Sequence, residues 1–178
     1  IASISSPPPE HPTPLKPVPE NSPTHQKLAG VMKLTPTDQD LQRLNELASD
    51  IYLFRAMPSH IVDQVCSRLE LYGFGDEEPL IKQGQKGEAF FILLDGKVDV
   101  VVNRNLFRKG RVLATLEAGS IFGEMSLIMN QPCNASVVAR DGARAFLASR
   151  SLFEYLLSFQ FFLTYECLQQ VTCKDCQH

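Results

Sequence analysis

One segment of the chain combines a tight turn with groups that can bind an anion. Gly123 follows the apolar pair Ile121-Phe122, and one short helix is expected to begin at this glycine turn and to end near Met129. The first backbone N–H groups of a helix have no partner within it and lie at the positive end of its dipole, where anions bind. Glu124, directly after the glycine, adds carboxylate oxygens that accept hydrogen bonds from ligand hydroxyl groups. The segment is therefore a candidate ligand site.

The residues on both sides of this segment are expected to form short strands joined by tight turns. From residue 70 to residue 148, glycines recur at short intervals and separate short apolar runs, which is typical of strands and turns. Ala89 to Leu94 is expected to be a buried strand. Asp95-Gly96 is expected to be a two-residue hairpin turn, because both positions of such a turn need positive φ. Further strands are expected over residues 98–102, 112–116, 134–139 and 144–148.

Helices are expected before these strands. Thr35 is expected to cap a first helix that begins at Pro36. Apolar residues then recur at helical spacing from Leu41 to Ile51, so one face of this helix is predicted to be buried. A second helix is expected over residues 59–69.

The chain is expected to divide into four parts. These are a proline-rich linker (1–34), a helical segment (35–69), a β-roll (70–148) and C-terminal helices that act as a lid or hinge (149–178). The order predicts an α+β fold. It is an antiparallel β-roll (jelly-roll-like) with N-terminal helices, one short helix inserted near residues 123–129, and C-terminal helices.

The two ends of the chain each leave two interpretations open. Eight of the 12 prolines lie in residues 1–26, which favours an extended linker that serves as a spacer or as a ligand for a proline-recognising groove. The C-terminal segment is strongly apolar, with Phe159, Phe161, Phe162, Leu163, Tyr165 and Leu168. It is expected either to pack on the core or to form a partner-binding or homodimer surface.

Composition excludes several classes of function. The net charge of −3 gives no long-range attraction to nucleic acid, and no apolar run is long enough to span a membrane. The odd number of cysteines, 5, favours a reducing, cytoplasmic setting. No nucleophile–base pair or P-loop indicates an enzyme, and Cys173, Cys176 and His178 lack the second ligand pair that zinc prefers. The chain begins with Ile1 and is expected to be part of a longer protein.

The candidate segment resembles the phosphate-binding cassette of the cyclic nucleotide-binding domain family. This family includes protein kinase A regulatory subunits, catabolite activator proteins and cyclic-nucleotide-gated channels. Its cassette reads Phe-Gly-Glu, then Leu, Ile or Met, then Ala or Ser, then Leu, and after a short loop Pro-Arg. This sequence supplies Phe122, Gly123, Glu124, Met125, Ser126, Leu127 and Pro132 in register, with supporting glycines at Gly84, Gly87, Gly96 and Gly119. The resemblance covers roughly residues 52–168.

The resemblance implies a role for each cassette residue. Glu124 would accept a hydrogen bond from a ribose 2′-hydroxyl, and Ser136 would contact the phosphate or a guanine amino group. Backbone N–H groups would come from Gly123, Ser126 and Ala135. Met125, Cys133 and Asn134 complete the expected ligand-binding set.

The chain departs from the family pattern at Cys133, where the family has an arginine. A thiol cannot form the charge-assisted pair that the guanidinium forms with a cyclic phosphate. We therefore expect a non-catalytic regulatory module that binds cAMP or cGMP weakly or not at all, and that interacts with a protein partner or effector domain. The alternative is a working cAMP or cGMP sensor with a substitute cation. Arg104 or Arg108 would have to fold back to supply it, whereas Arg140, an odd number of residues from Cys133, is expected to point to the other face.

Overall fold

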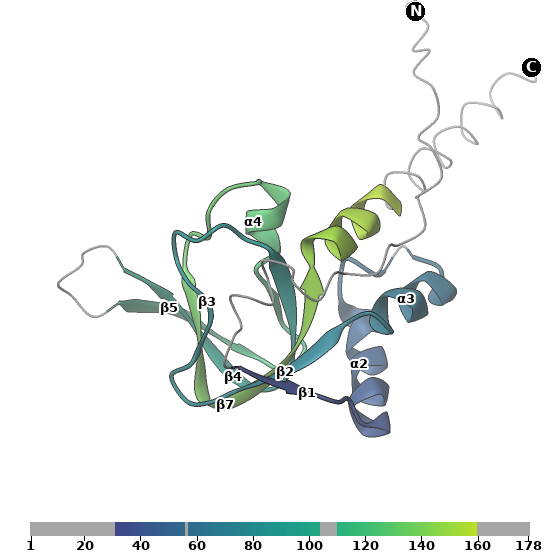
Figure 1. Ribbon diagram of the computed structural model, residues 1–178, viewed down its shortest axis with the longest axis horizontal. Coiled ribbons are helices and arrows are strands. Elements are labelled where there is room, and N and C mark those ends of the chain that lie inside the picture. Colours follow the sequence, from purple (N-terminus) through teal and green to yellow (C-terminus); the bar gives the residue numbers. More distant parts are fainter. Residues whose placement is uncertain (1–30, 56, 104–109, 160–178) are drawn as a thin grey trace, which may run out of the picture.

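The computed structural model describes residues 31–55, 57–103 and 110–159 of the chain, as an antiparallel β-roll with helices gathered at one end (Figure 1). The strands are β1 (Met32–Leu34), β2 (Glu70–Phe74), β3 (Pro79–Ile81), β4 (Ala89–Val102), β5 (Arg111–Glu117), β6 (Ile121–Phe122) and β7 (Ser136–Ser149). The helices are α2 (Asp38–Asp50), α3 (Ser59–Cys66) and α4 (Glu124–Ile128), and residues 150–159 are also helical.

All strand pairs of the sheet are antiparallel. The strand order is β1-β2-β7-β4-β5, with β3 added beside β7 and β6 beside β4. The two long strands β4 and β7 therefore form the centre of the roll, and α4 lies between β6 and β7 in the chain. The predicted α+β fold, with an antiparallel roll and one short inserted helix, is confirmed.

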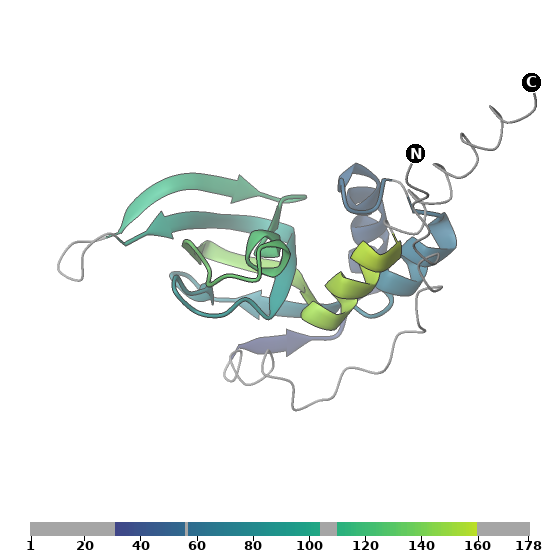
Figure 2. The ribbon, with the colours of Figure 1, turned by 90° about the horizontal axis from the view of Figure 1, so that it is seen from above.

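The apolar run at the start of β4 serves two cores. Phe90, Ile92 and Leu94 pack against α2, α3 and the helix of residues 150–159, while Ala89, Phe91 and Leu93 face the interior of the roll. The view from above shows these helices packed beside the end of the roll (Figure 2). Because alternate side chains of a strand point to opposite faces, a strand covered on both faces has a continuous apolar sequence.

The prediction of a hairpin turn at Asp95-Gly96 is wrong. The chain does not reverse there. It continues as β4 through a bulge, with register shifts against β7 between Leu93 and Asp95 and between Gly96 and Lys97. Gly96 has a φ of +83°, and a Cβ there would lie 2.5 Å from the carbonyl oxygen of Gly142. The positive φ expected at Gly96 is therefore present, but it allows the bent strands β4 and β7 to approach each other closely instead of forming a turn.

The partner strand β7 bends at the matching position, and two strands that were predicted separately form this one strand. The expected strands over 134–139 and 144–148 form the single strand β7, which passes through Asp141 (φ +57°) and Gly142 (φ +88°) without reversing. Both long strands thus bend at the same level, and this allows the sheet to curl into a roll.

The N-terminal boundaries also differ from the expectation. Thr37, not Thr35, caps α2, because its hydroxyl accepts from the Asp40 N–H while the Asp40 carboxylate accepts from the Thr37 N–H at 2.9 Å. This reciprocal pair is a capping box. Leu41, expected on the buried face, is 40% exposed. Helix α3 ends at Cys66 rather than at residue 69.

Residues 32–34, which were assigned to the linker, instead form β1 and pair with β2. Lys33 on this strand forms an ion pair with Glu70 on β2, at 3.3 Å. The proline-rich residues 1–26 lie outside the described residues.

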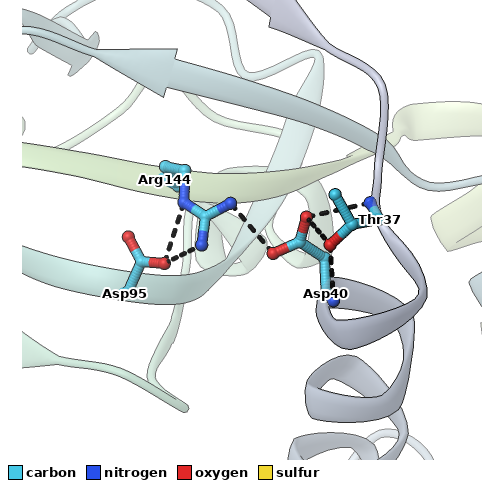
Figure 3. Close-up of polar contacts among 4 residues, drawn as sticks. All are labelled: Thr37, Asp40, Asp95 and Arg144. Carbon is cyan, nitrogen blue, oxygen red and sulfur yellow. Dashed lines mark hydrogen bonds and ion pairs between the residues drawn. The ribbon is translucent and has the colours of Figure 1, made fainter.

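Arg144 joins the helical segment to the roll (Figure 3). This β7 residue donates from Nη1 to Asp40 at 2.9 Å and from Nε to Asp95 of β4 at 2.9 Å. Asp40 is only 6% exposed. Its pKa is lowered by the hydrogen bond from the Thr37 backbone and, with smaller effect, by the nearby guanidinium, against the opposing effect of burial. One side chain therefore connects α2 to both central strands.

Candidate ligand site in the cassette

The start of α4 requires a glycine at position 123. Gly123 precedes the helix with a φ of +90°, and a Cβ there would lie 3.0 Å from the carbonyl oxygen of Ala89. The hydroxyl of Ser126, one turn later, donates to the Gly123 carbonyl at 2.8 Å. The turn is thus held against β4, and Glu124 is the first residue of α4.

Residues 83–87 position the other side of the site. The Gly84 N–H donates to the Cys133 carbonyl, and the Cys133 N–H donates to the Gln85 carbonyl, both at 2.8 Å. Gly87 lies directly against α4, because a Cβ there would be 1.9 Å from the Ser126 hydroxyl oxygen. The segment from Gly84 to Gly87 therefore fixes both α4 and the backbone of Cys133.

These elements enclose a cavity of about 280 Å³. Seven of the eight predicted site residues line it, namely Gly123, Glu124, Met125, Ser126, Cys133, Asn134 and Ala135. The predicted site residue Ser136 does not line it, and its hydroxyl accepts from the Gln83 N–H at 3.0 Å. The remaining lining residues are Ile81, Val100, Ile121, Phe122, Met129, Gln131, Pro132 and Val137.

The cavity carries negative charge without a matching cation. Glu124 is the only charged residue among the described residues that line it. Burial raises the pKa of Glu124, and a hydrogen bond from its own backbone opposes this. Its Oε2 atom is buried and has no hydrogen-bond partner within residues 31–55, 57–103 and 110–159.

Two described arginines near the roll bond to other groups. Arg140 donates to Asp99 from Nε at 3.0 Å and from Nη2 at 2.6 Å, and does not line the cavity, as the strand periodicity predicted. Arg150 donates to the Gly87 carbonyl at 2.7 Å. The predicted substitute cations Arg104 and Arg108 lie outside the described residues.

Two lysines line a second cavity that Cys133 also lines. This cavity of about 140 Å³ is lined by Lys82, Lys86 and Glu88 and shares Cys133 and Ile81 with the first. Lys86 forms an ion pair with Glu88 at 3.6 Å. Cys133 therefore belongs both to the cavity of Glu124 and to a neighbouring cavity with two lysines.

Comparison with known proteins agrees with this geometry. The family profile of the cyclic nucleotide-binding domain matches residues 74–158, which include β4 to β7, the whole cassette and most of the helix after it. These residues belong to the cyclic nucleotide-binding domain family.

Relatives of this domain include parts of regulated kinases. Human cGMP-dependent protein kinase 2 is 31% identical over 113 residues, which cover 62% of this chain and 14% of the kinase. The structure of cAMP-bound PfPKA-R matches with a TM-score of 0.64 and 18% identity, covering 70% of this chain and 44% of that one. The chain thus spans less than half the length of either relative.

A third relative is described as independent of cAMP. It is the regulatory subunit of a cAMP-independent protein kinase A from Trypanosoma brucei, with a TM-score of 0.59 and 22% identity over 75% of this chain and 47% of that chain. A variant of that protein carries three substitutions, one of which replaces threonine by arginine, and is bound to cAMP in its A site.

Two kinds of feature, a cluster of metal ligands and a membrane-spanning helix, are absent among the described residues. Within residues 31–55, 57–103 and 110–159, no group of three or more His, Cys, Asp or Glu side chains is placed to hold a metal ion. Among the same residues, no helix is long and apolar enough to cross a membrane. Cys173, Cys176 and His178 lie outside this part of the chain.

Proposed function

We propose that the domain is a non-catalytic regulatory module in which the binding of cyclic nucleotides is weak or lost. The observation that carries this proposal is Cys133 at the family's arginine position, in a cavity whose one described charge is that of Glu124. A cyclic phosphate entering the cavity would meet a carboxylate and no described cation.

The size of the effect follows from the missing charge pair. Truncating one partner of a buried, hydrogen-bonded charge pair costs about 2–5 kcal/mol, which is a loss of about 30-fold to several thousand-fold in affinity. A site of micromolar affinity would then bind cAMP no tighter than roughly 10–30 μM. The Trypanosoma relative supports this proposal, because its cAMP-bound variant includes a newly introduced arginine.

The test is to restore the cation. Cys133→Arg should strengthen cAMP binding by about tenfold or more, on the order of 1.4 kcal/mol, because Glu124 and the α4 turn remain in place. Cys133 lines the cassette cavity of about 280 Å³, so the longer side chain can extend into the space that the phosphate would enter. Cys133→Ser, neutral and similar in size, is the matched control and should not gain affinity. Calorimetry that finds sub-micromolar cAMP binding by the unmodified chain would contradict the proposal.

The proposed output of the module is contact with a protein. Helix α4 and the residue after it expose Met125, Ile128 and Met129, with 50%, 48% and 55% of their surfaces accessible, and Met125 and Met129 also line the cassette cavity. Apolar side chains clustered on one short helix favour a partner or an effector domain. The odd cysteine count favours a reducing, cytoplasmic setting. Homodimer formation through the C-terminal helix stays a prediction, because residues 160–178 lie outside the described structure.

The second candidate function is a working sensor with a substitute cation. The observation that favours it is that Lys82 and Lys86 line the neighbouring cavity, which Cys133 also lines. If either lysine reaches a cyclic phosphate, Lys82→Ala or Lys86→Ala should weaken cAMP binding at least about tenfold. Unchanged affinity in both variants would leave the weak-binding module as the better account.

A further inference from the structure

The cassette cavity has the shape of a nucleotide site but not its charge. Its walls are largely apolar, with side chains from Ile81, Val100, Ile121, Phe122, Met129 and Val137. Apolar walls of this kind accept the flat face of a base, since binding sites for small molecules are mostly apolar with a few polar groups that fix orientation. The volume of about 280 Å³ is close to the lower end of the range for such sites.

The polar groups of the cavity suit a neutral ligand. Gln131 and Asn134 add uncharged amide groups at its edge. Glu124 adds a carboxyl group, which is a strong acceptor for hydroxyl hydrogens and repels a phosphate. The raised pKa of Glu124 agrees with a carboxyl group that has no cationic partner.

Two described arginines of the roll are already paired with carboxylates. Arg140 is held by Asp99, and Arg144 is held between Asp40 and Asp95. Lys82 and Lys86 line the neighbouring cavity rather than this one, and Lys86 is paired with Glu88. The described walls of the cassette cavity therefore carry only the charge of Glu124.

We infer that the cavity binds an uncharged nucleoside in preference to the corresponding cyclic nucleotide, with Glu124 accepting from the ribose hydroxyls and the apolar walls holding the base. This inference rests on the proposed function, because it assumes that the cassette cavity is still a ligand site that disfavours phosphate. It adds the class of ligand that the site takes in place of a cyclic nucleotide.

The first experiment compares matched ligands by calorimetry on the full chain. Adenosine is titrated against cAMP, and guanosine against cGMP, with 2′-deoxyadenosine and adenine as probes of the hydroxyl contact. A nucleoside should bind at least about tenfold more tightly than its cyclic nucleotide. Removal of the 2′-hydroxyl should weaken binding at least about tenfold, because the acceptor then loses its donor. Equal binding of adenosine and 2′-deoxyadenosine would overturn the assignment of Glu124.

The second experiment uses one substitution with unequal effects on the two ligands. Glu124→Gln keeps the size of the side chain and removes its charge. It should weaken adenosine binding, because a neutral amide is a weaker acceptor, and should weaken cAMP binding less, because the loss of the same ribose contact is offset by the removed repulsion of phosphate. Cys133→Arg should shift the preference toward cAMP. A loss of both ligands in proportion, with a melting temperature no lower than that of the unmodified protein, would show that Glu124 does not discriminate charge.

The outcomes separate this inference from the proposed function. If unmodified protein binds neither adenosine nor cAMP but Cys133→Arg binds cAMP, the nucleoside inference fails and the proposed function stands. If unmodified protein binds cAMP more tightly than adenosine and below about 1 μM, both fail. If Cys133→Arg is folded by circular dichroism and binds no ligand of either class, the cavity is not a nucleoside or nucleotide site.

Discussion

At Glu124, the requirements of ligand binding and of stability oppose each other. Its Oε2 atom is buried without a hydrogen-bond partner in the described residues, and leaving such a group unpaired is costly. Burial raises its pKa above the ordinary value of 4.5, so the folded protein holds this proton more tightly than the unfolded chain. The contribution of Glu124 to the free energy of unfolding is therefore fully present below pH 4.5, where the carboxyl group is protonated, and is lost as the pH rises through the pKa of the folded state.

We predict that Glu124→Gln raises the melting temperature near neutral pH and that the gain disappears in acid. The amide cannot ionise, so it avoids the cost of burying a charge above the folded pKa. Thermal unfolding followed by circular dichroism between about pH 4 and pH 7.5 checks this. Glu117→Gln is the matched control. Glu117 is exposed, and a hydrogen bond from Lys97 lowers its pKa, so neutralising it should bring no gain. Equal gains in both variants would contradict the argument.

We predict that Gly87→Ala destabilises the domain by about 1–3 kcal/mol, the usual range for overpacking a tight site. A Cβ at this position would meet the Ser126 hydroxyl oxygen at 1.9 Å, and Ser126 is itself buried. The control Gly75→Ala should be tolerated, because the atom nearest to its Cβ is Glu78 Oε2 at 3.7 Å. Urea unfolding measures both. Equal stability of the two variants would show that α4 moves to accommodate the methyl group.

Single residues of the cavity could be predicted only where they belong to one local motif. The stretch from Gly123 to Ala135 is nearly continuous, so its resemblance to the family cassette indicated most of the cavity wall. Ile81 comes from β3, and its place in the cavity depends on long-range strand pairing that no local pattern contains. Ser136 has the right spacing, but its hydroxyl bonds to Gln83, which is 53 residues away in the sequence.

Among the elements, the contact between α2 and the roll depends on Arg144. We predict that Arg144→Gln costs about 1–3 kcal/mol, because it leaves the buried carboxylate of Asp40 without its cation. The control Arg140→Gln breaks a more exposed pair with Asp99 and should cost about 0.2–1 kcal/mol. Urea unfolding of both variants checks the difference. If the two losses are equal, the link between α2 and the roll contributes no more than a surface ion pair.

The elements show what local sequence can and cannot specify. The buried run at the start of β4 follows from its continuous apolar sequence, and helix α4 was expected from the glycine turn and the family cassette. The bend at Gly96 was predicted as a turn because positive φ suits a hairpin and a bulge alike, and the choice depends on the approach of Gly142 from the partner strand. Thr35 and Thr37 are both acceptable caps by type. Each also has an aspartate three residues later, Asp38 or Asp40, so this spacing does not choose between them, and the structure forms the capping box at Thr37 and Asp40.

At the scale of the whole molecule, two hydrophobic clusters share one pair of strands. The cluster beneath the helices includes Phe90 and Phe153, with ring centroids 5.6 Å apart. The cluster inside the roll includes Phe91 and Phe122, stacked at 5.4 Å. Phe90 and Phe91 are neighbours on β4, so loss of this strand would disrupt both clusters. The helices and the roll are therefore expected to unfold together.

We predict a single cooperative unfolding transition even when one cluster is damaged. Phe153→Ala, on the helical side, and Phe122→Ala, inside the roll, should each cost about 3–5 kcal/mol, the usual range for a buried phenylalanine. The chain has no tryptophan, so far-UV circular dichroism reports helices and strands while near-UV signals report tyrosines such as buried Tyr72. In both variants the two signals should change at the same urea concentration, because β4 and β7 contribute to both clusters. If Phe153→Ala loses helical signal at lower urea than the near-UV signal, the roll folds without the helices, and the shared strands do not couple the two clusters.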